Sequence, residues 1–146
     1  MDNQNIARIF EEISDLLEIK GVNPFKIRAY RNAAETLGSI PERLSDMDDN
    51  SLRAIPGIGK DLATRIRELS DTGTSTYHTE LLQEYPASLL ELLKLQGLGP
   101  KTVGLLHSSL GIKTIEELES AGQAGRLGEL RGLGPKKQEL ILQAID

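Results

Sequence analysis

The sequence predicts an all-α fold, and three features of the chain support this prediction. Apolar residues recur at helical spacing along most of the 146 residues. Capping residues, glycines and prolines separate these periodic segments at the positions where helices begin and end. Runs of β-branched residues with a period of two are missing. We therefore expect a succession of helices and no sheet.

The first half of the chain is predicted to form four helices. The first covers about residues 3–19. Asn23 and Pro24 then suit a cap and a first-turn proline. A short helix near 50–54 leads into a glycine turn, and the helix after that turn ends near Gly73. The apolar side of the second helix is expected to carry Phe25, Ala29, Tyr30, Ala33, Ala34 and Leu37.

The polar segment 71–75 contains a glycine and is the best candidate for a linker. We therefore expect an N-terminal helical domain over residues 1–73 and a helical subdomain over 76–146. Thr114 and Glu117 have the spacing of a capping box in the second part. The helices expected there cover 77–85, 88–95, a segment closed by Gly111, 114–121 and a final segment to Ile145.

One short phrase occurs three times in the chain. Each copy is an apolar residue, any residue, and then glycine, an apolar residue and glycine. The pattern resembles the helix-hairpin-helix, a motif that grips the sugar-phosphate backbone of DNA. It predicts three such motifs, at 55–71, 88–110 and 124–145. The three turns are Gly57-Ile58-Gly59, Gly97-Leu98-Gly99 and Gly132-Leu133-Gly134.

The physical chemistry of these turns favours phosphate binding. Glycines permit a tight turn with positive φ and leave no Cβ in the path of a ligand. The helix that follows offers unsatisfied N–H groups and a favourable dipole to an anion. Glycine pairs also serve as plain helix-helix turns, and on that reading the chain is a protein-interaction scaffold. The lysines after each turn, which could reach the same phosphate, are Lys60, Lys101, Lys136 and Lys137.

The formal net charge of −5 is unusual for a DNA-binding protein. Basic residues nevertheless gather in two acid-free stretches, 20–31 and 94–113. In the first stretch, Lys26 and Arg31 either contact phosphate or belong to a solvated helix face. The chain has no cysteine, no signal peptide and no long apolar run, so we expect a cytoplasmic monomer that does not enter membranes.

The string Arg28-Ala29-Tyr30-Arg31-Asn32-Ala33-Ala34, with Asn23-Pro24 before it and the first glycine turn after it, is similar to the N-terminal region of bacterial family X DNA polymerases. These enzymes are relatives of DNA polymerase beta. The second and third turns continue the resemblance over essentially the whole chain. It implies a small helical domain that binds the 5′-phosphate side of a DNA gap, followed by a subdomain that grips the primer side. Base excision repair is the process that the resemblance implies.

The resemblance does not extend to the polymerase reaction. Family members transfer nucleotides in a palm domain, where three carboxylates hold two metal ions. No palm fits in this chain, so we expect no polymerisation by these residues alone. Asp46 and Asp48 have the spacing of palm aspartates, but they lie in a polar loop and are better explained by capping. The two histidines, His78 and His107, are too few for the metal cluster of the bacterial phosphoesterase domain.

Lyase chemistry is a second point of departure. In polymerase beta a lysine removes a 5′-deoxyribose phosphate through a Schiff base. Arg65 occupies the matching position here, and a guanidinium is a poor amine nucleophile, so that site looks converted to binding. The resemblance assigns Lys26, Tyr30 and Arg53 to the phosphate pocket, whereas Asp61 and Tyr77 stand where polymerase beta has lysines. No catalytic residue is expected, and Lys60 is the alternative nucleophile of a 5′-deoxyribose-phosphate or abasic-site lyase.

Family members also bind a monovalent cation, Na⁺ or K⁺, through backbone carbonyls of the turns. By resemblance these carbonyls belong to Arg53, Ile55 and Ile58, and to Leu93, Leu95 and Leu98. No other cofactor is expected. The sequence as a whole predicts a module that binds gapped or nicked DNA by shape and phosphate and is indifferent to base sequence.

Overall fold

The computed structural model describes all 146 residues and consists of helices and turns without a strand. This confirms the predicted all-α fold. The chain divides into two compact units, residues 1–84 (unit 1) and 85–146 (unit 2). None of the helices combines the length and the apolar character that crossing a membrane requires.

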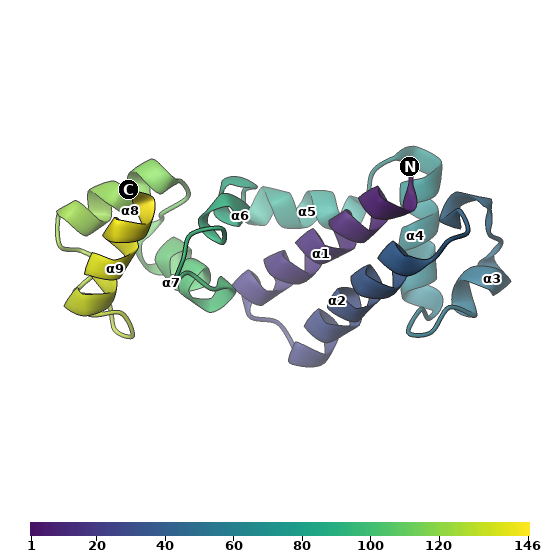
Figure 1. The fold of residues 1–146 in the computed structure, drawn as a ribbon, viewed down its shortest axis with the longest axis horizontal. Coiled ribbons are helices and arrows are strands. Elements are labelled where there is room, and N and C mark those ends of the chain that lie inside the picture. The colour runs from purple at the N-terminus through teal and green to yellow at the C-terminus, as the bar shows by residue number, and fades with distance from the viewer. The chain divides into compact units, whose positions relative to one another are not determined.

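Unit 1 is built on a pair of long helices, α1 (Asn3–Lys20) and α2 (Pro24–Ser39), which lie side by side (Figure 1). Gly21 ends α1 in the left-handed conformation with φ of 83°. Asn23 caps α2, because its side chain accepts a hydrogen bond of 2.8 Å from the Phe25 N–H. The residues that fill the space between these helices are fully buried, among them Ile6, Phe10, Ile13 and Leu37.

The α2 helix differs at two positions from its predicted apolar side, because Phe25 and Ala29 are both exposed. Tyr30, Ala33, Ala34 and Leu37 are buried as expected. Phe25, by contrast, is 74 % exposed, and its ring contacts the Arg28 guanidinium at 5.0 Å.

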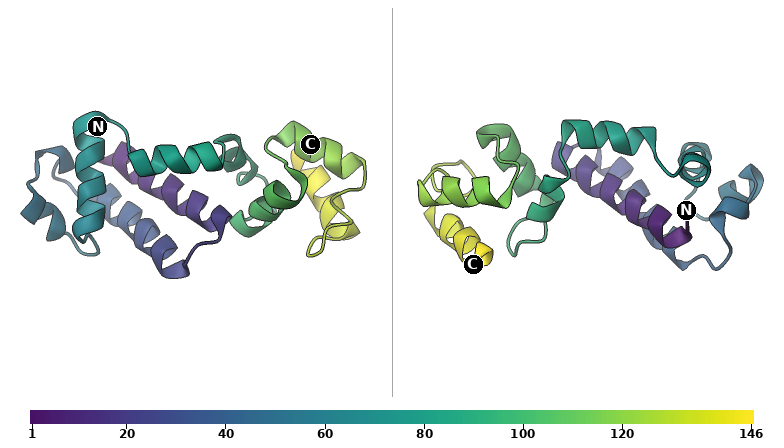
Figure 2. Two further views of the ribbon diagram at one scale, coloured as in Figure 1. Left: turned by 180° about the vertical axis from the view of Figure 1, so that it is seen from behind. Right: turned by 90° about the horizontal axis from the view of Figure 1, so that it is seen from above.

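The first helix-hairpin-helix of unit 1 consists of α3 (Asp49–Arg53), the glycine turn and α4 (Lys60–Thr72). The α4 helix lies across the end of the α1–α2 pair at which α1 begins (Figure 2). A short 3-10 helix, η1 (Leu44–Asp46), connects the two parts. Asn3 holds this connection in place, since its side chain donates to the Ile40 and Glu42 carbonyls and accepts from the Leu44 N–H.

Helix α5 (Thr76–Glu84) belongs to unit 1, whereas the sequence-based division between 73 and 76 placed it in the second part. The reason lies in α1, which buries nine of its 18 residues and is therefore covered by α5 as well as by α2. Leu81 is buried in this contact. The Lys20 Nζ lies 3.0 Å from a Glu84 carboxylate oxygen and closes the far end of the contact.

Unit 2 contains α6 (Ser88–Leu92), α7 (Pro100–Leu110), α8 (Ile115–Gln123) and α9 (Pro135–Ile145). The predicted capping box is confirmed, because the Thr114 and Glu117 side chains each bond the backbone of the other residue. Helices α8 and α9 pack closely where Gly122 faces Leu142: a Cβ at Gly122 would lie 2.7 Å from the Leu142 side chain. The core is formed by Leu89, Leu92, Leu98, Val103, Leu106, Leu118, Leu127 and Ile141.

The third helix-hairpin-helix, predicted over 124–145, lacks its first helix. Residues 124–134 form successive turns, and only α9 of the motif is helical. Gly125, Gly128, Gly132 and Gly134 fall in this stretch, and each glycine disfavours a helix by about 1 kcal/mol relative to alanine. The third glycine phrase is therefore a turn that leads into a helix and not a complete hairpin of helices.

Candidate nucleic-acid interface

The three glycine phrases fold into the same tight turn. In each, the N–H of the apolar residue between the glycines donates to the carbonyl three residues earlier, at 3.0, 3.2 and 3.1 Å for Ile58, Leu98 and Leu133. The first glycine of each phrase has a positive φ of 83°, 88° and 97° in chain order. This bond and the positive φ at the third turn residue match a type II turn, which favours glycine at that position.

The third turn differs from the first two in how it is anchored. Ile58 and Leu98 are 3 % and 6 % exposed, so a buried side chain fixes each of the first two turns to its unit. Leu133 is only half-buried. Gly134 has a φ of 90°, whereas Gly59 and Gly99 have extended backbones with φ of −90° and −100°. The first two turns thus form one matched pair.

The helices that follow the glycine turns begin without a side-chain cap. In α1, α2, α3 and α8, an Asp, Asn or Thr side chain accepts a hydrogen bond from the first turn of the helix. In α4, α7 and α9 the N-cap residue is glycine and no side chain accepts such a bond. The first N–H groups of these helices therefore remain available to an external acceptor.

The space beside the glycines of the first two turns is open. A Cβ built on Gly57, Gly59, Gly97 or Gly99 would meet no atom within 4 Å. An anion can therefore approach the N–H groups that begin α4 and α7, where the helix dipole also favours negative charge.

Four side chains of unit 1 form a cationic and aromatic group that we call the Arg65 cluster: Lys26, Tyr30, Arg65 and Tyr77. The Arg65 Nε donates a hydrogen bond of 2.7 Å to the Tyr30 hydroxyl. The Arg65 guanidinium and the Lys26 Nζ lie 4.3 and 4.9 Å from the centre of the Tyr77 ring. Two positive groups thus share one aromatic ring, each at the distance of a cation–π interaction.

The aromatic rings of this cluster hold Arg65 in one orientation. Tyr30 stacks on Tyr77 with ring centroids 6.0 Å apart, and its ring centroid lies 5.5 Å from that of Phe10. Burial raises the pKa of the Tyr30 hydroxyl, so this group stays protonated and neutral. Tyr30 is 4 % exposed, and its hydroxyl is bonded to Arg65. The terminal nitrogens of Arg65 donate to no protein acceptor and retain the fork geometry that suits a phosphate.

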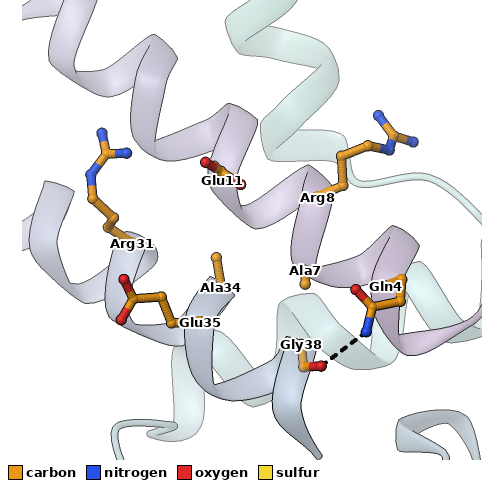
Figure 3. A pocket seen from close by; sticks show the side chains of 8 residues that line it. All are labelled: Gln4, Ala7, Arg8, Glu11, Arg31, Ala34, Glu35 and Gly38. Atoms are coloured by element: carbon orange, nitrogen blue, oxygen red, sulfur yellow. Dashed lines mark hydrogen bonds between the residues drawn. The ribbon is translucent and has the colours of Figure 1, made fainter.

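Arg31, which the sequence assigned to phosphate binding, lies apart from the Arg65 cluster. Its guanidinium pairs with Asp15 at 3.2 Å and with Glu18 at 3.0 Å, so acids on α1 occupy it. It borders a hollow of about 420 Å³ between α1 and α2, which Figure 3 shows with Glu11 and Glu35 along its sides. Arg8 lines it as well, so two guanidinium groups and two carboxylates border the hollow and it carries no excess of positive charge.

The remaining basic residues predicted to contact DNA are exposed, and none of them is in an ion pair: Arg53, Lys60, Lys101, Lys136 and Lys137. The charge is unequally divided between the units. Unit 2 carries seven Lys or Arg and seven Asp or Glu residues, so the formal net charge of −5 falls on unit 1. Positive charge in unit 1 is therefore local, at the Arg65 cluster, and Asp61 stands in the first turn of α4.

The backbone of the first two turns fits the monovalent cation that the resemblance implies. No N–H group donates to the carbonyls of Arg53 and Ile58, or to the matching carbonyls of Leu93 and Leu98. The Ile55 and Leu95 carbonyls each accept one bond and keep a second lone pair. When bound there, a cation would supply positive charge beside a phosphate.

Carboxylates do not form a metal centre in this chain. No three His, Cys, Asp or Glu side chains are grouped so that they could hold a metal ion. The Asp48 side chain caps α3 by accepting a bond of 2.8 Å from the Ser51 N–H, and these bonds lower its pKa. The capping interpretation is thus confirmed for Asp48.

Comparison with known families agrees with this geometry. The model of a helix-hairpin-helix domain matches residues 1–75, and that of a SAM-like helix-hairpin-helix tandem matches residues 89–146. The chain belongs to the helix-hairpin-helix family. The second match includes α6, which is only five residues long, and residues 124–134, which form turns where a helix was predicted. The tandem is thus recognisable from the sequence although its helices are incomplete.

Three curated relatives are DNA polymerases or a DNA nucleotidylexotransferase. The DNA polymerase/3′-5′ exonuclease PolX of Bacillus subtilis (strain 168) is 40 % identical over 145 residues, which is 99 % of this chain and 25 % of that protein. The DNA nucleotidylexotransferase of Ambystoma mexicanum is 29 % identical over 82 % of this chain and 23 % of its own length. DNA polymerase lambda of Arabidopsis thaliana is 27 % identical over 86 % of this chain and 24 % of its own length.

The similarity to the N-terminal region of family X DNA polymerases is thereby confirmed. The chain spans about a quarter of the length of these curated relatives.

Proposed function

We propose that this chain is a sequence-independent DNA-binding module of a family X repair polymerase and that it grips the phosphates of gapped or nicked DNA. One observation carries the proposal: α4 and α7 begin at glycine turns without a side-chain cap, whereas α1, α2, α3 and α8 carry caps of their own. Backbone N–H groups bind phosphate irrespective of base sequence.

The Arg65 cluster supports the finer part of the proposal, which is recognition of a 5′-phosphate. A terminal phosphate carries more charge than a phosphodiester and exposes more oxygens to a forked donor. Arg65 is oriented by Tyr30 and Tyr77, and Lys26 adds a second positive charge at the same ring. A gap or nick offers such an end, whereas an intact duplex does not.

Fluorescence anisotropy tests the proposal with three labelled DNAs: a one-nucleotide gap with a 5′-phosphate, the same gap without it, and intact duplex. We expect affinity in that order, and weaker binding of all three as salt rises. Arg65→Ala should weaken binding of the phosphorylated gap about tenfold, because it removes a charge-assisted contact. Arg8→Ala is the matched control, since Arg8 is exposed and pairs with Glu12 on α1.

Equal affinity for gap and duplex would contradict gap recognition. Absence of binding at low salt would contradict DNA binding altogether and favour the interaction scaffold.

A further inference from the structure

A shallow hollow in unit 2 adjoins the second glycine turn and has no part in the contacts described above. Its volume is about 410 Å³, and it is lined by Gln96 and Gly97 of the turn and by Leu140, Gln143 and Ala144 of α9. Leu140 is 55 % exposed. The hollow therefore presents apolar surface directly beside the turn that precedes the uncapped start of α7.

The lining of this hollow is chemically matched to the uncharged part of a nucleotide. It contains an isobutyl group, a methyl group, a bare glycine and two amides, and no charged side chain. A carboxylate at this place would repel a DNA strand, and none lines the hollow. An amide both donates and accepts hydrogen bonds, so it can meet either kind of group on a base edge.

The hollow lies close along the chain to the proposed phosphate contact at the start of α7. Gly97 lines the hollow, and Gly99 begins α7 two residues later, a chain distance of at most about 7 Å. Successive nucleotides of one strand rise by about 3.4 Å along the duplex axis. A strand whose phosphate lies at the start of α7 thus has a neighbouring sugar within reach of the hollow.

We propose that the hollow receives the deoxyribose and minor-groove edge of the nucleotide next to the phosphate held at α7. This inference rests on the proposed DNA-binding function. Leu140 packs against the sugar, in the way that apolar side chains enter the minor groove in other complexes. The Gln96 and Gln143 amides bond to base edges there. Every base pair presents acceptors in the minor groove, so these contacts are compatible with any sequence.

Leu140→Ala in the full 146-residue chain tests this assignment. With the gapped DNA we expect affinity to fall about fivefold, since the variant loses the apolar contact between the Leu140 side chain and the sugar. The dependence of affinity on salt should keep its slope, because no ion pair is removed. Lys101→Ala should instead reduce that slope. Leu140→Met, which keeps the apolar volume, should restore the affinity.

Hydroxyl-radical footprinting gives an independent readout, because the radical attacks sugars from the minor groove. The wild-type chain should protect one or two sugars on the primer side of the gap. Leu140→Ala should lose this protection at a concentration that saturates the DNA, while protection elsewhere persists.

The outcomes separate this inference from the proposed function. If the wild-type chain fails to bind DNA, the proposed function fails and this inference with it. If the wild-type chain binds and a folded Leu140→Ala variant shows equal affinity and equal sugar protection, this inference alone is overturned. A Leu140→Ala variant that changes only self-association in sedimentation would also overturn it and would identify a second copy of the chain as the occupant.

Discussion

At the scale of single residues, the structure fixes the side chain of Arg65, which stands at the position that the resemblance matches to a lysine nucleophile. The Tyr30 hydroxyl accepts from its Nε and the Tyr77 ring faces its guanidinium, so the side chain is fixed while its outer nitrogens stay free. A guanidinium stays protonated at biological pH. Arg65 is thus suited to hold a phosphate and unsuited to attack a sugar aldehyde.

This leads to a prediction about covalent chemistry. When the wild-type chain meets a 5′-deoxyribose-phosphate end in the presence of borohydride, which traps Schiff bases, we expect no adduct. Arg65→Lys should form one, because its amine would lie beside Lys26, whose positive charge lowers the pKa of a neighbouring amine. Arg67→Lys is the matched control on the same helix, since Arg67 is bound to the Met47 carbonyl.

Trapping by the wild-type chain would contradict the binding-only assignment of Arg65. Loss of that trapping in Lys60→Ala would then identify Lys60 as the nucleophile and establish the lyase alternative.

Residue roles could be predicted from the sequence where local rules decide them. The Asn23 and Thr114 caps are such cases, since a cap depends on a few neighbouring residues. Arg31 and Phe25 depend on tertiary packing. Arg31 meets two acids of α1 that are 13 and 16 residues away, and Phe25 remains exposed beside Arg28. No periodicity within α2 could have indicated either outcome.

At the scale of elements, the two glycines of each turn have different structural roles, which the sequence alone does not distinguish. The first glycine supplies a positive φ, and the second, at Gly59 and Gly99, supplies a helix start without a cap. The third phrase keeps the turn but loses the preceding helix and the extended second glycine. Helix length and anchoring in that segment are set by packing, and the phrase alone does not contain them.

The two glycines of the first turn should therefore respond differently to substitution. Gly59→Ser places a hydroxyl at an N-cap position with extended backbone and open space. It should cap α4, raise the free energy of unfolding by a few tenths of a kcal/mol, and weaken DNA binding by occupying the N–H groups. Gly57→Val should lower both the free energy of unfolding and the affinity for DNA, because valine at a φ of 83° costs about 1 kcal/mol or more in backbone strain.

Urea unfolding and anisotropy with gapped DNA measure both effects on the same preparations. A Gly59→Ser variant that is folded and binds DNA as well as the wild-type chain would show that the start of α4 does not hold a phosphate.

At the scale of the whole molecule, a DNA-binding role coexists with a net charge of −5 because the charge is arranged locally. Acids and arginines balance one another around the hollow that Arg31 borders, whereas the Arg65 cluster gathers two cations at one ring. The sequence showed acid-free stretches but could not show which of their cations meet acids from other helices. The assignment of α5 to unit 1 was equally hidden, since it depends on the width of the apolar face of α1.

The most direct test of the central claim is a ¹H–¹⁵N NMR titration of the chain with gapped, 5′-phosphorylated DNA. We expect the largest shifts at the amides that begin α4 and α7, residues 59–62 and 99–102 apart from Pro100, because a phosphate there accepts hydrogen bonds from those groups. The side-chain-capped starts of α1 and α3 serve as internal controls and should shift little. Unchanged amides at 59–62 and 99–102, with the largest shifts elsewhere, would contradict it.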